Sequence, residues 1–101
     1  ELILLPGNPD ASFHVYNQYT IRAPQRDQLI VYLREQGIST EVYYPSPLHL
    51  EPAFACFSYG TGSFPHAEAA CNEVLSLPIY PELTATQQEA VVHAIARFYS
   101  R

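Results

Sequence analysis

Apolar and polar residues alternate along residues 13–22, "FHVYNQYTIR", and many of them are β-branched or aromatic. This composition predicts a β-strand. The alternation divides its side chains between two faces: Val15, Asn17, Tyr19 and Ile21 on one, and His14, Tyr16, Gln18 and Thr20 on the other. A second run of this kind, "ISTEVYY" at residues 38–44, predicts a second strand.

Apolar residues at three- and four-residue steps predict three helices. The first lies in residues 25–37, after Pro24, and Gly37 is typical of the position just past a helix end. The residues that follow its helical spacing are Leu29, Tyr32, Leu33 and Gln36. The second is predicted to start near Phe64–Pro65, with a stripe of Ala67, Ala70, Cys71, Val74 and Leu75.

The third predicted helix starts after Thr84, whose side chain can cap it together with Gln87, three residues further on. Its buried stripe is Val91, Ile95 and Phe98, with Val92 and Tyr99 alongside. Between the second and third helices, "SLPIYPEL" at residues 76–83 is broken by two prolines, so an extended segment or short edge strand is expected there.

The order of elements is therefore strand, helix, strand, loop, helix, extended segment, helix. This order predicts an α/β domain of two layers, an α+β arrangement in which about three helices cover a small sheet. Residues 1–12, "ELILLPGNPDAS", are punctuated by proline and glycine, so we expect a linker there and the domain itself in residues 13–101.

Composition narrows the possible functions. The chain of 101 residues is long enough for one domain, and 48% of its residues are hydrophobic. Its net charge of -5 disfavours non-specific binding to nucleic acid. "ELILLP" is too short to span a membrane. All five basic residues are arginines, so a Schiff-base lysine, a P-loop lysine and a Ser-Lys nucleophile are excluded within this chain.

The cysteines and histidines give no metal signature. None of the four histidines stands at zinc-ligand spacing from a cysteine or from another histidine, so no metal site is predicted. Cys56 and Cys71 are compatible with one disulfide or with two buried free thiols. "YGTGSF" lacks the lysine of a P-loop and the third glycine of a dinucleotide fingerprint, and is read as a turn.

The segment "YYPSPLHL", residues 43–50, follows the end of a predicted strand, where ligands often bind in α/β sheets. Two prolines stiffen it, which lowers the entropy cost of holding side chains towards a ligand. Tyrosine offers a ring and a hydroxyl to a polar, ring-shaped ligand. Two interpretations stay open: Tyr43 and Tyr44 contact a ligand, or one tyrosine fills the core while His49 caps a turn.

Several blocks of this chain, in order, resemble the C-terminal small domain of the DegT/DnrJ/StrS family of sugar aminotransferases. The blocks are "HVYNQYTIRAPQRDQLIVYLREQGISTEVYYPSPLHLEPAF" and "FPHAEAACNEVLSLPIYPEL". The resemblance runs from Phe13 to Phe98 and implies the aspartate-aminotransferase fold type. The chain contains no methionine and starts within an apolar run, so we expect it to be part of a longer protein.

The resemblance implies a function for the whole protein. It implies a cytoplasmic homodimer that uses pyridoxal 5'-phosphate to transfer an amino group from an amino acid, usually glutamate, to a nucleotide-linked keto sugar. The cofactor lysine would belong to a large N-terminal domain, so this chain has no catalytic residue and would be inactive alone. It implies neither nucleic-acid nor membrane partners. Two alternatives remain: a dehydratase of the same family, or a non-enzymatic module that binds nucleotide sugars.

The resemblance also implies substrate-binding residues. Tyr43, Tyr44 and Pro45 stand where the family often has His-Tyr-Pro, facing the sugar and phosphate of the substrate, and His49 matches a Pro-Leu-His-Leu segment. In "HVYNQY", the residues that match are His14, Gln18 and Tyr19, which are expected to line the active site. The chain departs from the family at three positions: Tyr43 and Asn17 replace histidine, and Glu51 replaces glutamine.

Overall fold

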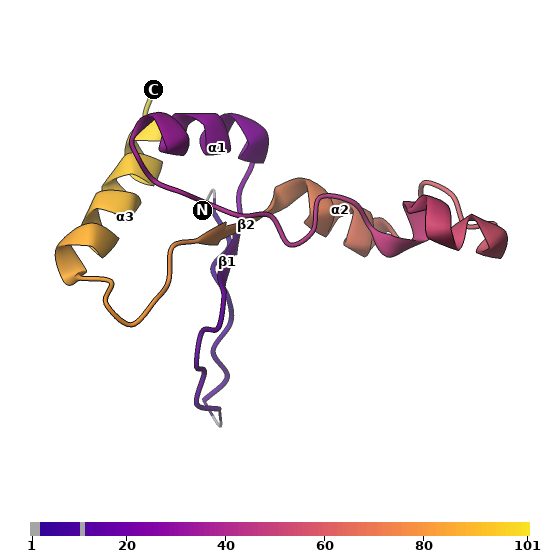
Figure 1. The fold of residues 1–101 in the computed structure, drawn as a ribbon, viewed down its shortest axis with the longest axis horizontal. Coiled ribbons are helices and arrows are strands. Elements are labelled where there is room, and N and C mark those ends of the chain that lie inside the picture. The colour runs from indigo at the N-terminus through magenta and orange to yellow at the C-terminus, as the bar shows by residue number, and fades with distance from the viewer. Residues whose placement is uncertain (1–2, 11) are drawn as a thin grey trace.

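The computed structural model describes residues 3–10 and 12–101. The regular elements are, in chain order, β1 (Tyr19–Arg22), α1 (Arg26–Glu35), the 3-10 helices η1 (Leu48–Leu50) and η2 (Pro52–Phe57), α2 (Pro65–Glu73), β2 (Val74–Leu77) and α3 (Ala85–Tyr99). A small sheet stands at the centre, α1 and α3 lie beside it, and two segments leave the body in different directions (Figure 1). This confirms the predicted α+β class with a small sheet and about three helices.

The sheet consists of β1 and β2, which pair antiparallel with Ile21 opposite Leu75. Two isolated bridges extend it, one from Leu4 to Arg22 and one from Glu41 to Ser76. The strands are shorter than the alternation predicts. Of the predicted strand at 13–22 only the last four residues form one, and of the predicted strand at 38–44 only Glu41 makes a bridge.

The shortening of the first strand has a simple cause. Residues 12–18 run away from the sheet, so they lie beyond the reach of β2 and have no ladder to join (Figure 1). Phe13 and Val15, at the start of the predicted strand, are 94% and 75% exposed. A strand forms only where a partner supplies its hydrogen bonds, and alternation alone does not supply one.

Helices α1 and α3 pack on one face of the sheet and make the core. Ile21 and Leu75 belong to this face. They are opposite each other in the register, so their side chains point to the same side of the sheet. The buried cluster consists of Ile21, Ala23, Leu29, Tyr32, Leu33, Leu75, Val91, Ala94 and Ile95. The predicted stripes are confirmed at Leu29, Leu33, Val91 and Ile95. Gln36, which follows the helical spacing of the first stripe, and Val92, which was expected alongside the second, are both exposed.

Helix α1 is fixed at both ends. At its start Arg26 is buried, and its Nη1 donates to the carbonyl oxygen of Val74 at 2.9 Å, which ties the helix to β2. At its end Gly37 has a φ of +76°, a left-handed conformation that glycine adopts without strain. The predicted stop of this helix at Gly37 is therefore confirmed.

Helix α3 has the capping box that the sequence predicts. The Gln87 backbone N–H donates to Thr84 Oγ1 at 3.2 Å, and the Thr84 backbone N–H donates to Gln87 Oε1 at 2.9 Å. Two backbone N–H groups that the first helical turn leaves without partners are thereby satisfied.

Replacing Thr84 with alanine is expected to lower the free energy of unfolding by about 1 kcal/mol, because the cap hydrogen bond to the Gln87 N–H is lost. Thr86→Ala is the matched control, since Thr86 is also exposed but lies inside the helix. Thermal denaturation followed by circular dichroism compares the two variants. Equal melting temperatures would show that the cap contributes nothing.

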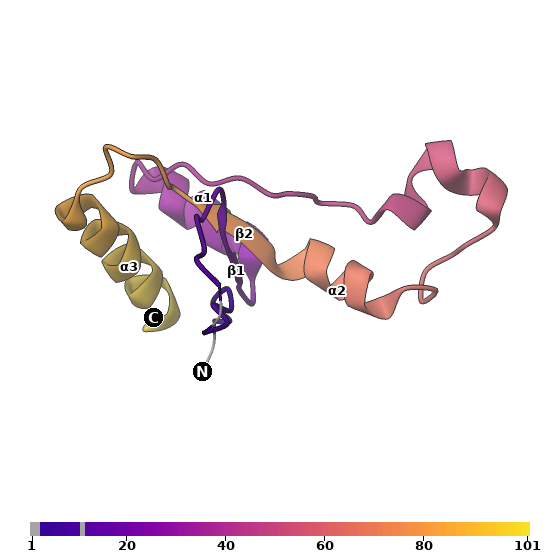
Figure 2. The same ribbon diagram turned by 90° about the horizontal axis from the view of Figure 1, so that it is seen from below.

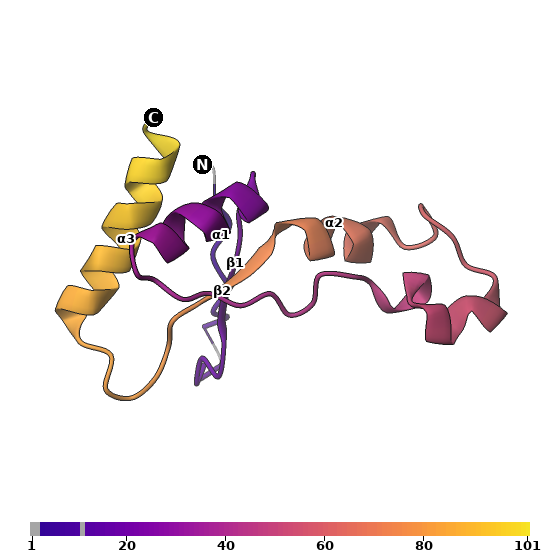
Figure 3. The same cartoon turned by 45° about the horizontal axis from the view of Figure 1, so that its top comes forward.

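Residues 44–73, called the arm below, extend far from the body (Figures 1 and 3). The arm contains η1, η2, a turn at residues 58–64 and α2, and none of its three helices has a buried residue. Helix α2 ends at Glu73 and β2 begins at Val74, with no loop between them (Figure 2). The predicted second helix is therefore wrong at Val74 and Leu75, which belong to the sheet. In the described part of the chain no helix meets the length and apolarity that crossing a membrane requires.

Candidate substrate-facing site

The sheet has a second face, opposite α1 and α3, and this face is polar. Thr20 and Ser76 are opposite each other in the register, and their hydroxyl oxygens are 2.8 Å apart. Next to them Arg22 Nε donates to Glu73 Oε2 at 2.8 Å. Because Glu41 bridges to Ser76, the segment that leads to Tyr43 runs along this part of the sheet.

A hollow of about 320 Å³ lies where these segments meet. Its walls come from the ends of three segments that are far apart in sequence: Gln18, Ser39, Thr40, Glu41, Tyr43, Ser76, Leu77, Pro78, Ile79 and Tyr80. The polar groups are an amide, several hydroxyls and a carboxylate, all of which form hydrogen bonds with hydroxyl-bearing ligands. Among the described residues that line it, none is an arginine or a histidine.

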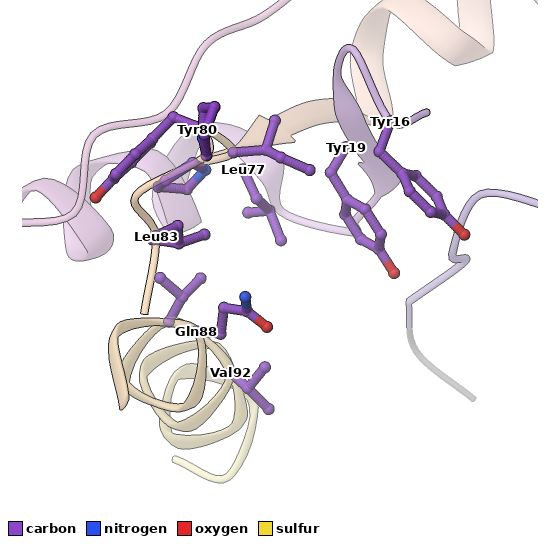
Figure 4. A pocket seen from close by; sticks show the side chains of 11 residues that line it. Tyr16, Tyr19, Leu77, Tyr80, Leu83, Gln88 and Val92 are labelled. Atoms are coloured by element: carbon purple, nitrogen blue, oxygen red, sulfur yellow. The ribbon is translucent and has the colours of Figure 1, made fainter. Parts of the chain in front are cut away.

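A larger hollow of about 500 Å³ lies on the other side of the segment that follows β2, against α3. Tyr16 and Tyr19 form one wall, with ring centroids 5.4 Å apart, and Gln88 and Val92 of α3 form the opposite wall (Figure 4). The segment after β2 therefore separates the two hollows, and Tyr80 on this segment lines both of them.

The structure places the six predicted substrate-binding residues in different surroundings. Gln18 and Tyr43 share the 320 Å³ hollow, and Tyr19 faces the larger one. Tyr44 is next to Tyr43 and 71% exposed. His14 lies on the exposed segment before β1, stacked on Tyr16 at a centroid distance of 4.1 Å. His49 lies in the arm, outside both hollows.

His49 is held by a carboxylate. Its Nε2 is 2.9 Å from Glu68 Oε1 in α2, and because a carboxylate only accepts, Nε2 carries the proton. The same carboxylate accepts from the Gly62 backbone N–H at 2.8 and 2.9 Å and from the Phe64 N–H at 3.3 Å. These hydrogen bonds, with Gly62 contributing most, hold the pKa of Glu68 below its ordinary value of 4.5, against the effect of burial. We call this cluster the latch.

The sequence reasoning missed several residues of the smaller hollow. Tyr80 was read only as part of an extended segment, and Thr40 and Glu41 as part of a strand. The signal for Tyr80 was available, since "PIYP" at residues 78–81 places Tyr80 directly before a proline, just as Tyr44 stands directly before Pro45. No local sequence signal predicts that Thr40 and Glu41 line the hollow, because they reach it only through the bridge between Glu41 and Ser76, which are far apart in sequence.

The cysteines are both free, Cys56 exposed and Cys71 partly buried, so the expectation of buried thiols is wrong for Cys56. Cys56 lies on η2, which has no core of its own to bury it. Within residues 3–10 and 12–101, no three His, Cys, Asp or Glu side chains come together as metal ligands would.

The chain is thus a two-layer α+β domain with a hollow beside the polar face of its sheet. The chain belongs to the DegT/DnrJ/EryC1/StrS aminotransferase family, whose pattern matches residues 1–96. It is 54% identical over 99 residues to the pleiotropic regulatory protein of Geobacillus stearothermophilus, covering 98% of this chain and 27% of that one.

Two further comparisons concern Streptomyces venezuelae. The dTDP-3-amino-3,4,6-trideoxy-alpha-D-glucose transaminase of that organism is 40% identical over 97 residues, which is 96% of this chain and 26% of the transaminase. The crystal structure of S. venezuelae DesV in complex with a ketimine intermediate superposes with a TM-score of 0.93 at 38% identity, covering 100% of this chain and 27% of that one. The chain thus spans about a quarter of the length of the relatives it matches.

Pyridoxal phosphate enzymes hold their cofactor through a lysine amine. This chain has no lysine, so its residues do not fit the covalent site of that cofactor. The described residues form no such covalent site; they form the hollow of about 320 Å³, which is lined by hydroxyl and amide groups.

Proposed function

We propose that this chain is the small domain of a nucleotide-sugar aminotransferase, and that the 320 Å³ hollow faces the sugar of the substrate. The whole protein would transfer an amino group from an amino acid, with glutamate as the expected donor, to a nucleotide-linked keto sugar, as a cytoplasmic homodimer. Pyridoxal phosphate and its lysine would belong to a large domain, joined through residues 1–12 to the domain at residues 13–101. The proposal rests on Gln18 and Tyr43 meeting in one hollow.

The chemistry of the hollow favours the sugar over the diphosphate. Tyrosine and glutamine side chains both donate and accept hydrogen bonds, which suits sugar hydroxyls. Glu41 adds a negative charge, and none of the described lining residues is a cation that would neutralise a phosphate. We therefore expect the diphosphate of the substrate to bind to groups outside this hollow.

The test is the variant Tyr43→Phe in the full-length protein. Loss of the phenolic hydroxyl is expected to raise the KM for the nucleotide sugar about fivefold, because one ligand hydrogen bond is worth about 1 kcal/mol. The KM for the amino-acid donor should stay unchanged. Tyr59→Phe is the control, since Tyr59 is exposed on the arm and far from the hollow in sequence. Unchanged sugar kinetics in Tyr43→Phe would remove Tyr43 from the site.

A second candidate is a non-enzymatic module that binds nucleotide sugars. The observation that favours it is the 54% identity to a protein named as a pleiotropic regulatory protein. A dehydratase of the same family would share this small domain. Incubation of the full-length protein with a nucleotide keto sugar and glutamate separates the three: an aminated sugar supports the transferase, a deoxygenated sugar the dehydratase, and binding without turnover the module.

A further inference from the structure

The carboxylate of Glu41 is the charged group of the 320 Å³ hollow. Ten described residues line this hollow, and the other nine carry no formal charge at neutral pH. A neutral lining distinguishes ligands by shape and by hydrogen bonds, whereas a fixed charge also distinguishes them by their own charge. Among the described lining residues, Glu41 is therefore the one that can select a ligand by charge.

The backbone fixes the position of Glu41. Its N–H donates to the Ser76 carbonyl oxygen at 3.1 Å, and its carbonyl oxygen accepts from the Ser76 N–H at 2.8 Å. Residues paired in this way on antiparallel segments present their side chains on the same face, and Ser76 is itself opposite Thr20. Glu41, Ser76 and Thr20 thus form a row across the polar face of the sheet, with the carboxylate at one end.

The negative charge of this carboxylate is available to a ligand. Within residues 3–10 and 12–101, no arginine or histidine lies within 4 Å of the Glu41 carboxylate to form an ion pair with it. Arg34 of α1 lines an adjoining hollow of about 220 Å³ together with Glu41, but it does not line the 320 Å³ hollow. The described surroundings therefore leave the charge without a counter-ion on the side of the hollow.

A sugar that carries a carboxylate would bring a second negative charge into the same hollow. Like charges a few ångströms apart near a protein surface repel each other enough to weaken binding on the order of tenfold. A sugar without a carboxylate escapes this repulsion, and its hydroxyl groups can donate hydrogen bonds to Glu41. A misplaced charge of this kind is a general means by which a site rejects a competitor of similar shape.

We propose that Glu41 is a specificity-determining residue, which restricts the hollow to sugars without a carboxylate. This rests on the proposed function, in which the hollow faces the sugar of a nucleotide sugar. It adds a substrate class to that function: nucleotide-linked sugars with an uncharged ring are accepted, and nucleotide-linked uronic acids are rejected.

The first test measures the binding of two matched ligands to the full-length protein. UDP-glucose and UDP-glucuronate share the nucleotide and the diphosphate, and differ only in a hydroxymethyl group or a carboxylate on the sugar. The same pair is also tested on dTDP, and the ratio of dissociation constants is taken from the carrier whose glucose form binds more tightly. Isothermal titration calorimetry should give a Kd about tenfold higher for the glucuronate. Equal constants would overturn the proposal.

The second test changes the charge at position 41. Glu41→Gln removes the charge at nearly constant size, and the ratio of the glucuronate Kd to the glucose Kd should fall to about two or less. Glu41→Arg should invert the ratio, so that the glucuronate binds more tightly. Glu41 is exposed and its hydrogen bonds to Ser76 are main-chain, so both variants should keep the fold. A ratio that stays near ten in both variants would refute the role of Glu41.

Glu35→Gln is the matched control. Glu35 is exposed on α1, which packs on the opposite face of the sheet, and it is not among the described residues that line the hollow. The change raises the net charge of the protein by one, as Glu41→Gln does. The ratio should stay near ten in this control. A fall equal to that in Glu41→Gln would assign the discrimination to the overall charge of the protein and overturn the proposal.

Salt separates charge repulsion from a steric effect. At an ionic strength of about 1 M the Debye length is about 3 Å, so the repulsion between two carboxylates in an open hollow is largely screened. The ratio for the unmodified protein should then fall at least about twofold, because the diphosphate contributes equally to both ligands and cancels. A ratio independent of salt would show that the glucuronate is rejected for its shape, against the proposal.

The same measurements distinguish this inference from the function on which it rests. If neither UDP-glucose nor dTDP-glucose binds to the full-length protein, the proposed function fails, and the inference fails with it. If the glucose and glucuronate forms bind equally well, a nucleotide-sugar site is supported and only the role of Glu41 is lost.

Discussion

The variant Leu75→Ala is expected to reduce the free energy of unfolding of this domain by about 3 kcal/mol, which lies within the range for a fully buried leucine. Leu75 is 0% exposed and lies opposite Ile21 at the centre of the sheet. Its side chain fills the space between the sheet and the helices, so truncation leaves a cavity in a core of few residues. A small core has few neighbours that can move in to fill it.

Amide hydrogen exchange of the full-length protein measures this effect locally. At 1.4 kcal/mol for each factor of ten, the backbone amides of Leu29 and Leu33 should exchange about 100-fold faster in Leu75→Ala. Val92→Ala is the control, because Val92 is exposed on α3, and it should change exchange less than twofold. If both variants exchanged alike, Leu75 would not be a core residue.

Replacing Glu68 with glutamine is expected to open the arm. A neutral amide cannot accept on both atoms from the Gly62 N–H, and its NH₂ group would face N–H donors that now lack a partner. The amides of Gly62 and Phe64 should then exchange at least about tenfold faster, while the amides of β1 and β2 stay protected. Glu89→Gln, an exposed change on α3, is the control and should leave the arm unaffected.

The latch should also respond to pH. The folded pKa of Glu68 lies below the ordinary 4.5, so the unfolded arm binds the proton more readily than the latched arm does. The stabilisation is therefore complete above pH 4.5 and is lost as the pH falls through the lowered pKa. The NMR chemical shift of the Gly62 amide should report this transition with a midpoint below 4.5. A midpoint at or above 4.5 would contradict it.

The helices at the two ends of the domain could be predicted because their signals are local. Thr84 and Gln87 define the start of α3 by themselves, and Gly37 defines the end of α1. The sheet could not be predicted in the same way, since a strand depends on a partner that is distant in sequence. Val74 and Leu75 continue the helical spacing of α2, yet pairing with Arg22 and Ile21 places them in β2.

The residues of the candidate site differ in the same way: some could be predicted from the sequence, and others depend on a long-range contact. Tyr43 could be proposed from the stiff segment around it, and Gln18 from the family resemblance. Thr40 and Glu41 could not, because they reach the hollow through one bridge to Ser76. His49 had two possible roles in the sequence, and its hydrogen bond to Glu68 in the structure supports the anchoring of a loop.

The direct passage from Glu73 in α2 to Val74 in β2 restricts how the length of this chain can change in evolution. An inserted residue there would shift the register of β2 by one and turn Leu75 from the core to the polar face. The junction is further fixed by the Arg22 ion pair and by the Ala23 N–H, which donates to the Glu73 carbonyl oxygen at 2.9 Å. The turn at residues 58–63 is exposed and pairs with no strand, so insertions and deletions should concentrate there.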